Sequence, residues 1–253
     1  MLLTRRTVLA LALTAGCSAA RPRSSPLTHP APTVHQGSGA GTTQTPTAVG
    51  RGESAEEITH GPRSANAVAL TFHGAGDLEL AIGLLGEVQR AGARITVLAV
   101  GSWLEVNPAM ARRILDGGHE LGNHTLTHPP LRRLDAAACY GEIDGCARVL
   151  QRLTGTRGRW FRPSGTPHAT PLIAAQAGRA GYRTSLSYDV DPRDYADPGA
   201  AAVRDRTLAA VRPGSIVSLH LGHAGTVAAL PGIIDGLRSQ GLRAVTVGAL
   251  LAP

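Results

Sequence analysis

The stretch 118-GHELGNHTLTHP-129 decides how we interpret the chain. A short extended segment, Glu120–Asn123, leads into two histidines, His124 and His128, which are four positions apart. Four residues make about one helical turn, so a single turn would place both imidazoles on the same side. Two neutral imidazoles aimed at one point are a common half of a zinc site. We therefore predict a metal site here; the alternative is a turn-capping histidine beside a surface histidine.

Segments with strand and helix patterns alternate on both sides of this stretch, from about residue 65 to residue 253. Alternation with short connections predicts a parallel sheet covered by helices. About seven such units in fewer than 190 residues predict one domain, a distorted (β/α)7-type barrel. We expect strands at 67–72, 94–100, 120–123, 159–162, 182–188, 215–219 and 242–247, and helices at 77–91, 108–115, 135–153, 171–180, 200–211 and 227–239.

Polar and ionisable residues follow the predicted strands rather than being scattered along the chain. In an α/β barrel the carboxyl ends of the strands meet at one mouth, where active sites are built. Five separate segments would therefore deliver side chains to one place. These residues are His73 and Asp77, His124 and His128, Arg162, Asp191 and Asp194, and His220 and His223.

Several of these positions form motifs that resemble those of the polysaccharide deacetylase family (carbohydrate esterase family four, the NodB homology domain). The resemblance covers residues 65–253 and implies a distorted (β/α) barrel that removes acetyl groups from chitin-like polymers, peptidoglycan or xylan. The matching motifs are His124-Thr125-x-x-His128, Arg162-Pro163, Asp191-Pro192-Arg193-Asp194-Tyr195 and Leu219-His220.

The first motif of the family is altered in this chain. Family members usually read Thr-Phe-Asp-Asp-Gly, in which the first Asp is the catalytic base and the second is a metal ligand. Here the stretch is 71-TFHGAGD-77, so His73 holds the base position and Gly74 the ligand position. A carboxylate returns only at Asp77. The arginine motif also differs, with Ser164-Gly165 where the family often has Pro-aromatic-Gly.

The resemblance implies a divalent metal ion, of which Zn²⁺ is the expected one, bound by His124 and His128. The third protein ligand is left open by the altered motif. The flexible glycines before Asp77 could bring its carboxylate to the metal, and we favour this interpretation. Otherwise His73 binds the metal directly and Asp77 caps the helix that it begins.

With Asp77 as a ligand, His73 is the candidate general base, because an imidazole suits proton transfer near neutral pH. By resemblance, a metal-activated water attacks the acetyl carbonyl and His220 protonates the leaving group. Asp191 would orient His220, as carboxylates commonly orient imidazoles. Arg162, which tunes the catalytic Asp in the family, would hold Asp77, Asp191 or substrate here.

We therefore expect a hydrolase that deacetylates a cell-envelope or extracellular polysaccharide, with N-acetyl groups favoured over O-acetyl groups. The altered first motif supports an alternative, a lipoprotein that binds glycan without turning it over. Trp103 and Trp160 could stack on a sugar, but in a chain with only 3% aromatic residues we expect them in the core.

Composition restricts the class of partner. All 25 basic residues are arginine, and the formal net charge is +7. No basic and aromatic interleaving indicates nucleic acid, although weak attraction to anionic envelope polymers is expected. Cys139 and Cys146 lie seven residues apart in a predicted helix, roughly 10 Å, too far to form a disulfide.

The N-terminal region has the features of an exported lipoprotein. Residues 1–17 combine Arg5 and Arg6, a short apolar run and a lipoprotein-type box ending in Cys17. We expect lipidation of Cys17 and anchoring to the cell membrane, with plain secretion as the alternative. Residues 18–64 are rich in Pro, Gly, Ser and Thr and predict a disordered tether.

Overall fold

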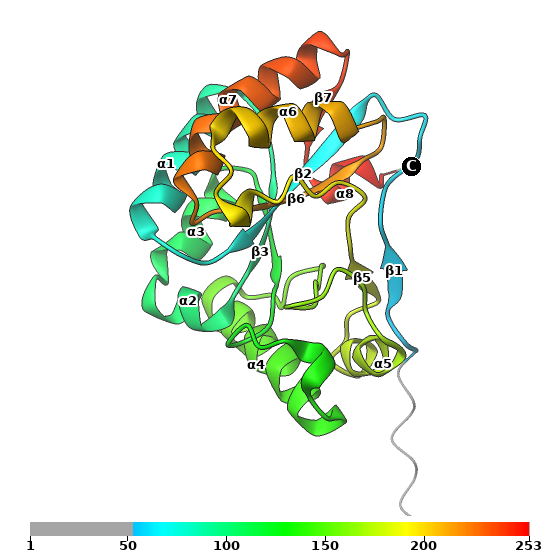
Figure 1. Ribbon diagram of the computed structural model, residues 1–253. Helices are drawn as coiled ribbons and strands as arrows, with labels where there is room; N and C mark the ends of the chain where they lie inside the picture. The colour runs from blue at the N-terminus through cyan, green and yellow to red at the C-terminus, as the bar shows by residue number, and fades with distance from the viewer. Residues whose placement is uncertain (1–52, 253) are drawn as a thin grey trace, which may run out of the picture. The chain divides into compact units, whose positions relative to one another are not determined.

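Strand β2 (Ala67–Gly74) lies at the centre of the sheet, and nearly all of its residues are buried. In this computed structural model, which describes residues 53–252, every strand pair of the sheet is parallel. The sheet order is β4 (Glu120–Asn123), β3 (Thr96–Ala99), β2 and β6 (Ile216–His220), and β7 (Arg243–Val245) pairs with the first residues of β2 (Figure 1).

Isolated β-bridges of one residue each connect this sheet to the remaining strands and give it the form of a barrel. A second parallel pair, β1 (Glu56–Ile58) and β5 (Thr184–Leu186), is joined to β4 through Phe161, which bridges both Asn123 and Ser185. A further bridge, between Val190 and Val217, returns the chain to β6. The predicted distorted (β/α)7-type fold is confirmed, with the irregular closure lying between β4 and β6.

Helices cover the outside of the sheet through apolar faces. In α1, for example, Ala81, Leu84, Leu85 and Val88 are buried at the spacing of one helical face. Helices α1, α6 and α7 lie together on one side of the molecule in Figure 1. The helices are α1 (Leu78–Arg90), α2 (Gly101–Val106), α3 (Ala109–Asp116), α4 (Ala136–Thr154), α5 (Pro171–Arg179), α6 (Ala200–Ala210), α7 (Ala224–Ser239) and α8 (Val247–Leu250), with 3-10 turns at Leu131–Arg133 and Asp194–Ala196.

The end of the predicted tether is part of the folded domain. Residues 53–64 include β1, and Glu57 in that strand accepts hydrogen bonds from His168 Nδ1 at 2.9 Å and from the Ala169 amide at 2.8 Å. The prediction of disorder up to residue 64 is therefore wrong for this segment, because a three-residue strand is too short to show a period. The predicted leader, Cys17 and residues 18–52 lie outside the described residues.

One further prediction concerns the cysteines of a helix. Cys139 and Cys146 are buried free thiols on α4, so the expectation that they do not bridge is confirmed. Burial raises the pKa of Cys146 to about 12, which keeps this thiol protonated and unreactive. Among residues 53–252, no helix combines the length and apolar character needed to cross a bilayer.

Candidate active site

Four imidazoles meet where the strands end. His73 is the seventh residue of β2, His220 is the last residue of β6, and His124 follows β4 directly. The His73 ring lies 4.2 Å from the His124 ring and 4.5 Å from the His220 ring, measured between centroids. His128 joins them, with its ring 4.8 Å from that of His124. This arrangement agrees with the prediction that the residues following the strands lie close together.

An irregular turn, not a helical one, brings His124 and His128 together. Thr125 and His128 both have a left-handed backbone, with φ of 71° and 63°. Such angles are strained for a β-branched residue like threonine. Hydrogen bonds hold the backbone of Thr125, since its amide donates to Asn123 Oδ1 at 2.8 Å and its carbonyl accepts from the Gly101 amide at 2.9 Å. The predicted helical turn is wrong, although the two imidazoles still face each other.

The protonation of His124 leaves one nitrogen free for a metal ion. Its Nδ1 lies 3.0 Å from the carbonyl oxygen of Arg162, which can only accept a hydrogen bond, so Nδ1 carries the proton. Nε2 is therefore a lone-pair donor, and it lies 3.1 Å from Nε2 of His128. Burial and the neighbouring His128 lower the pKa of His124 well below its usual value, so the imidazole stays neutral.

The spacing of these two nitrogens fits a divalent metal ion. Two nitrogens bound to one tetrahedral zinc at about 2.0–2.1 Å lie roughly 3.3 Å apart, close to the 3.1 Å between the two Nε2 atoms. The orientation of His124 by a backbone carbonyl is also typical of metal-binding histidines. The geometry of His124 and His128 therefore suits two of the three protein ligands that such a site normally uses.

Asp77 is not placed as the third ligand. Its carboxylate is the N-cap of α1 and accepts a hydrogen bond from the Leu80 amide at 2.9 Å. Within residues 53–252, no group of three His, Cys, Asp or Glu side chains is arranged to hold a metal ion. The structure thus corresponds to the alternative in which Asp77 caps its helix. His73 belongs to no such group of three among these residues either, and its Nε2 lies 3.4 Å from Ser218 Oγ.

Gly74 leaves no room for a ligand at the position where the family has its second Asp. A Cβ atom added to Gly74 would lie 2.8 Å from Cγ1 of Val97 and 3.0 Å from Cα of Ala99. This direction leads into β3, which pairs with β2 in register through Gly74 and Ala99. A carboxylate at this position would therefore require the Val97 side chain or the backbone at Ala99 to move.

Asp194, not Asp191, is the carboxylate that orients His220. Asp194 is 1% exposed, and its Oδ1 lies 2.8 Å from His220 Nδ1. Its Oδ2 accepts from the His220 amide at 2.8 Å and from Thr226 Oγ1 at 2.6 Å. Asp191 is exposed and accepts from the Arg193 amide at 2.8 Å. The expectation for Asp191 is corrected because the turn at Asp194–Ala196 carries the second carboxylate inward.

Arg162 is fully buried beneath the imidazoles. Its Nε donates to the carbonyl of Leu186 at 3.0 Å and its Nη2 to that of Ser187 at 3.1 Å. Within the described part of the chain, Nη1 has no hydrogen-bond partner and no carboxylate pairs with the guanidinium. Burial lowers the pKa of Arg162 to about 10, so it stays charged at neutral pH. Of the expected partners, neither Asp77 nor Asp191 contacts it.

A cavity of about 450 Å³ opens above the imidazoles and adjoins one of about 210 Å³. Both are lined by His73, His128 and His220, and the larger one also by Tyr195, whose side chain is half exposed, and Asp191. The volume is typical of a small-molecule site. His223 lies at the smaller cavity and pairs with Asp197 at 2.8 Å.

The two tryptophans belong to the core, as expected. Trp103 is 8% exposed and donates from Nε1 to the carbonyl of Gly76 at 2.9 Å. Trp160 is 1% exposed and donates to Glu120 Oε2 at 2.9 Å. Neither lines the cavities above the imidazoles.

Substitution of Asp77 separates helix capping from metal binding. We expect Asp77→Ala to lower the free energy of unfolding by about 1 kcal/mol, because the N-cap hydrogen bond is lost. Asp77→Asn, which retains the cap, should be close to wild type in stability. Both variants should retain the wild-type zinc content in elemental analysis. Loss of zinc from both would instead make Asp77 a ligand.

Comparison with known proteins places these residues in a family context. The polysaccharide deacetylase family model matches residues 60–185. A peptidoglycan-N-acetylglucosamine deacetylase of Bacillus cereus is 31% identical over 194 residues, which cover 75% of this chain and 90% of the relative. A chitooligosaccharide deacetylase of a Bradyrhizobium strain is 34% identical over 137 residues, which cover 51% of this chain and 58% of the relative.

Solved structures of similar proteins include both active and inactive members. A peptidoglycan N-acetylglucosamine deacetylase has a TM-score of 0.72 and 28% identity, covering 77% of this chain and 92% of its own. A pseudoenzyme of carbohydrate esterase family four from Bacillus anthracis has a TM-score of 0.73 and 26% identity, covering 79% of this chain and 70% of its own. A mutant of that pseudoenzyme, with restored enzymatic activity, matches equally well, with a TM-score of 0.73.

Proposed function

Because the chain belongs to the polysaccharide deacetylase family, we propose that it is a metal-dependent hydrolase that removes acetyl groups from a cell-envelope polysaccharide. N-acetyl groups of a peptidoglycan- or chitin-like polymer are the favoured substrate, as the names of its relatives indicate. One observation carries the proposal: the His220–Asp194 pair and the His124–His128 pair lie together around His73.

His124 and His128 would hold the metal ion, and Zn²⁺ is the ion that two imidazoles of this spacing suit best. When bound, such an ion supplies a Lewis acid that polarises an acetyl carbonyl. The chain's own contribution is to fix the ring of His124. The backbone carbonyl of Arg162 accepts a hydrogen bond from His124 Nδ1. The buried guanidinium of Arg162 in turn donates hydrogen bonds to the carbonyls of Leu186 and Ser187.

His73 is suited to accept a proton from the attacking water. Burial lowers the pKa of His73 well below its usual value, and the neighbouring His124 and Arg162 side chains lower it further. The ring is therefore neutral at physiological pH, as a base must be before it acts. It also lines both cavities, where a substrate carbonyl and a water molecule could reach it.

His220 is suited to protonate the leaving nitrogen. Its Nδ1 faces Asp194 Oδ1, which keeps a proton on Nδ1 and fixes the ring. Nε2 is then the nitrogen that can pass a proton to a group in the cavity. Tyr195, with its ring 5.5 Å from that of His220 and 49% exposed, offers an aromatic face to a sugar at the rim.

A second candidate function is glycan binding without turnover. Its support is the first motif, where neither His73 nor Gly74 supplies a carboxylate and Gly74 has no space for one. The similarity to a family pseudoenzyme is consistent with this alternative. In that case the cavity would bind an acetylated oligosaccharide and release no acetate.

Export and lipid anchoring complete the proposal. A protein attached to the membrane through Cys17 would meet envelope polysaccharide, and its positive net charge, which remains after Arg5 and Arg6 of the leader are removed, favours anionic polymers in the same layer. The support for this step is the N-terminal sequence alone. Radiolabelled fatty acid should be incorporated into the wild-type protein and not into Cys17→Ala.

An acetate-release assay distinguishes the two candidate functions. We expect the zinc-loaded protein to release acetate from N-acetylglucosamine oligomers, and chelation followed by zinc addition to remove and restore the activity. Binding of the same oligomers with no acetate released at any metal concentration would establish the non-catalytic alternative instead.

A further inference from the structure

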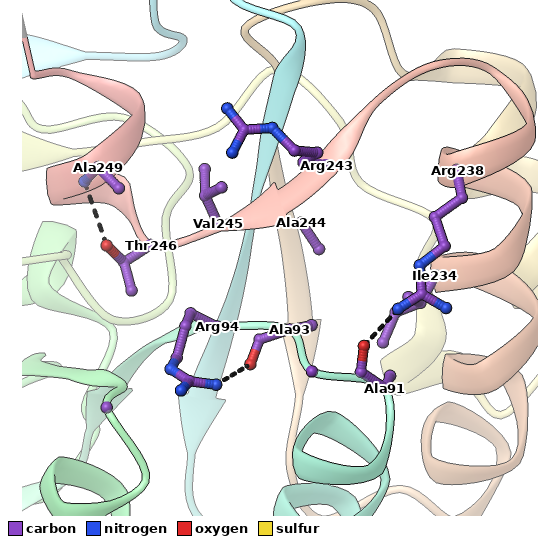
Figure 2. A pocket seen from close by; sticks show the side chains of 12 residues that line it. Ala91, Ala93, Arg94, Ile234, Arg238, Arg243, Ala244, Val245, Thr246 and Ala249 are labelled. Atoms are coloured by element: carbon purple, nitrogen blue, oxygen red, sulfur yellow. Dashed lines mark hydrogen bonds between the residues drawn. The ribbon is translucent and has the colours of Figure 1, made fainter.

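Another cavity lies at the opposite end of the barrel from the imidazoles. Its volume is about 500 Å³, and it is lined by the segment before β3, by β7 and by α7 (Figure 2). Arg243, which begins β7, pairs with Ala67 in β2, and His73 lies six residues further along that strand. At about 3.3 Å per residue, the two sites are roughly 20 Å apart.

The cavity exists because two strands share one edge of β2. Strand β7 pairs with residues 67–69 and β3 with residues 71–74, while β6 occupies the other edge along residues 69–73. Between β7 and the start of β3, the chain from Ala91 to Arg94 turns away from β2 and leaves an open space. This cavity is therefore a consequence of the sheet topology.

Three arginines from separate segments surround this space. Figure 2 shows Arg94 before β3, Arg243 on β7 and Arg238 on α7 around the cavity. No acidic residue lines it, and Arg94 and Arg243 form no ion pair with any carboxylate among residues 53–252. Arg238 is partly neutralised, since its Nη1 lies 3.1 Å from Asp235, and it also donates to the carbonyl of Ala91.

The carboxylate of Glu120, which contacts Gly248 beside this cavity, is occupied by other hydrogen bonds. Glu120 accepts hydrogen bonds from Thr96 at 2.8 Å, from Trp160 at 2.9 Å and from the Gly248 amide at 3.0 Å. Within residues 53–252, Glu120 forms no ion pair with any of the three arginines. Two guanidiniums with free donors and a third that is partly paired create a positive potential inside a concave surface, where the field of each adds to the others.

We propose that this cavity binds a phosphate ester of a sugar or polyol. A phosphate group presents three acceptor oxygens and suits several guanidiniums at once, whereas a single guanidinium satisfies a carboxylate. The remaining wall is apolar, with Ile234, Ala244 and Val245, and accommodates a carbon skeleton. The cavity volume is within the range of small-molecule sites. Phosphate-bearing glycan could thus be held at one end while acetylated glycan is processed at the other.

Calorimetric titration of the whole protein tests this proposal with three probes: inorganic phosphate, a hexose 6-phosphate and poly(glycerol phosphate). We expect saturable binding of the hexose phosphate that weakens at least tenfold in Arg94→Gln/Arg243→Gln. The matched control is Arg112→Gln/Arg183→Gln, which removes the same charge from two exposed arginines outside the cavity and should bind like wild type. Tighter binding of the polymer than of the monoester would identify a phosphodiester source.

Acetate release should be unchanged in Arg94→Gln/Arg243→Gln, because neither arginine lies near the imidazoles. Hexose phosphate binding that is equal in wild type and the double variant, or that falls equally in the control, would overturn the proposal. Absence of saturable binding by any probe to the folded wild-type protein would overturn it as well.

Discussion

His124→Ala should remove both bound metal and acetate release. The substitution deletes the imidazole whose Nε2 is available as a lone-pair donor beside Nε2 of His128. Since loss of even an outer partner of a metal ligand commonly lowers affinity by about 10–100-fold, loss of the ligand itself should exceed about 100-fold. Zinc content by elemental analysis and acetate release at saturating substrate measure the two effects.

The matched control for His124→Ala is His60→Ala. His60 is an exposed histidine that contacts the carbonyl of Gly61 and lies outside the four-imidazole cluster. This variant should retain zinc and activity. Wild-type zinc content in His124→Ala, with the fold intact, would show that the ion is held elsewhere.

Asp194→Asn should lower kcat by about 10²–10⁴-fold with little change in zinc content, because Asp194 positions His220 as the proton donor. Asparagine cannot accept at both positions where the carboxylate does, so it loses hydrogen bonds from His220, Thr226 or both. An amide nitrogen facing Nδ1 would also favour the wrong tautomer of the imidazole. The dependence of kcat on pH should lose the limb that reports the proton donor.

Asp191→Asn is the control for that variant and should change kcat by less than about threefold. Its carboxylate is exposed and accepts from the Arg193 amide, with no contact to His220. A larger loss of kcat in Asp191→Asn than in Asp194→Asn would contradict the structural assignment and favour the original expectation from the motif.

Much of the fold could be predicted from the sequence, because local patterns are strong where apolar strands and glycine-terminated helices alternate. The expected strand at 120–123 and the expected helix at 171–180 match β4 and α5 within one residue. Helix α2 was missed because tertiary contacts support it: the amides of Gly101 and Ser102 donate to the carbonyls of Thr125 and Leu126. Local sequence carries no sign of such partners.

The sequence predicts which residues form the site better than it predicts the contacts between them. His73, His124, His128 and His220 meet because parallel strands deliver their carboxyl ends to one mouth. A short 3-10 turn, preceded by Arg193 in a left-handed conformation, determines which carboxylate reaches His220. The spacing of residues in the sequence does not reveal the conformation of this turn.

The position of the Asp77 carboxylate was also not predictable from the spacing of the motif. The glycines before it permit many paths, yet an aspartate directly before a helix has a strong local use as an N-cap. In the structure this local hydrogen bond holds the carboxylate at the start of α1. The local capping preference therefore determines where this carboxylate lies.

The most direct test is a crystal structure of the zinc-soaked protein recorded at the zinc absorption edge. We predict one strong anomalous peak that lies about 2.0–2.1 Å from both Nε2 atoms of His124 and His128. The peak should lie on the cavity that His73 and His220 line. A peak elsewhere, or none at saturating zinc, would contradict the proposed metal-dependent deacetylase site.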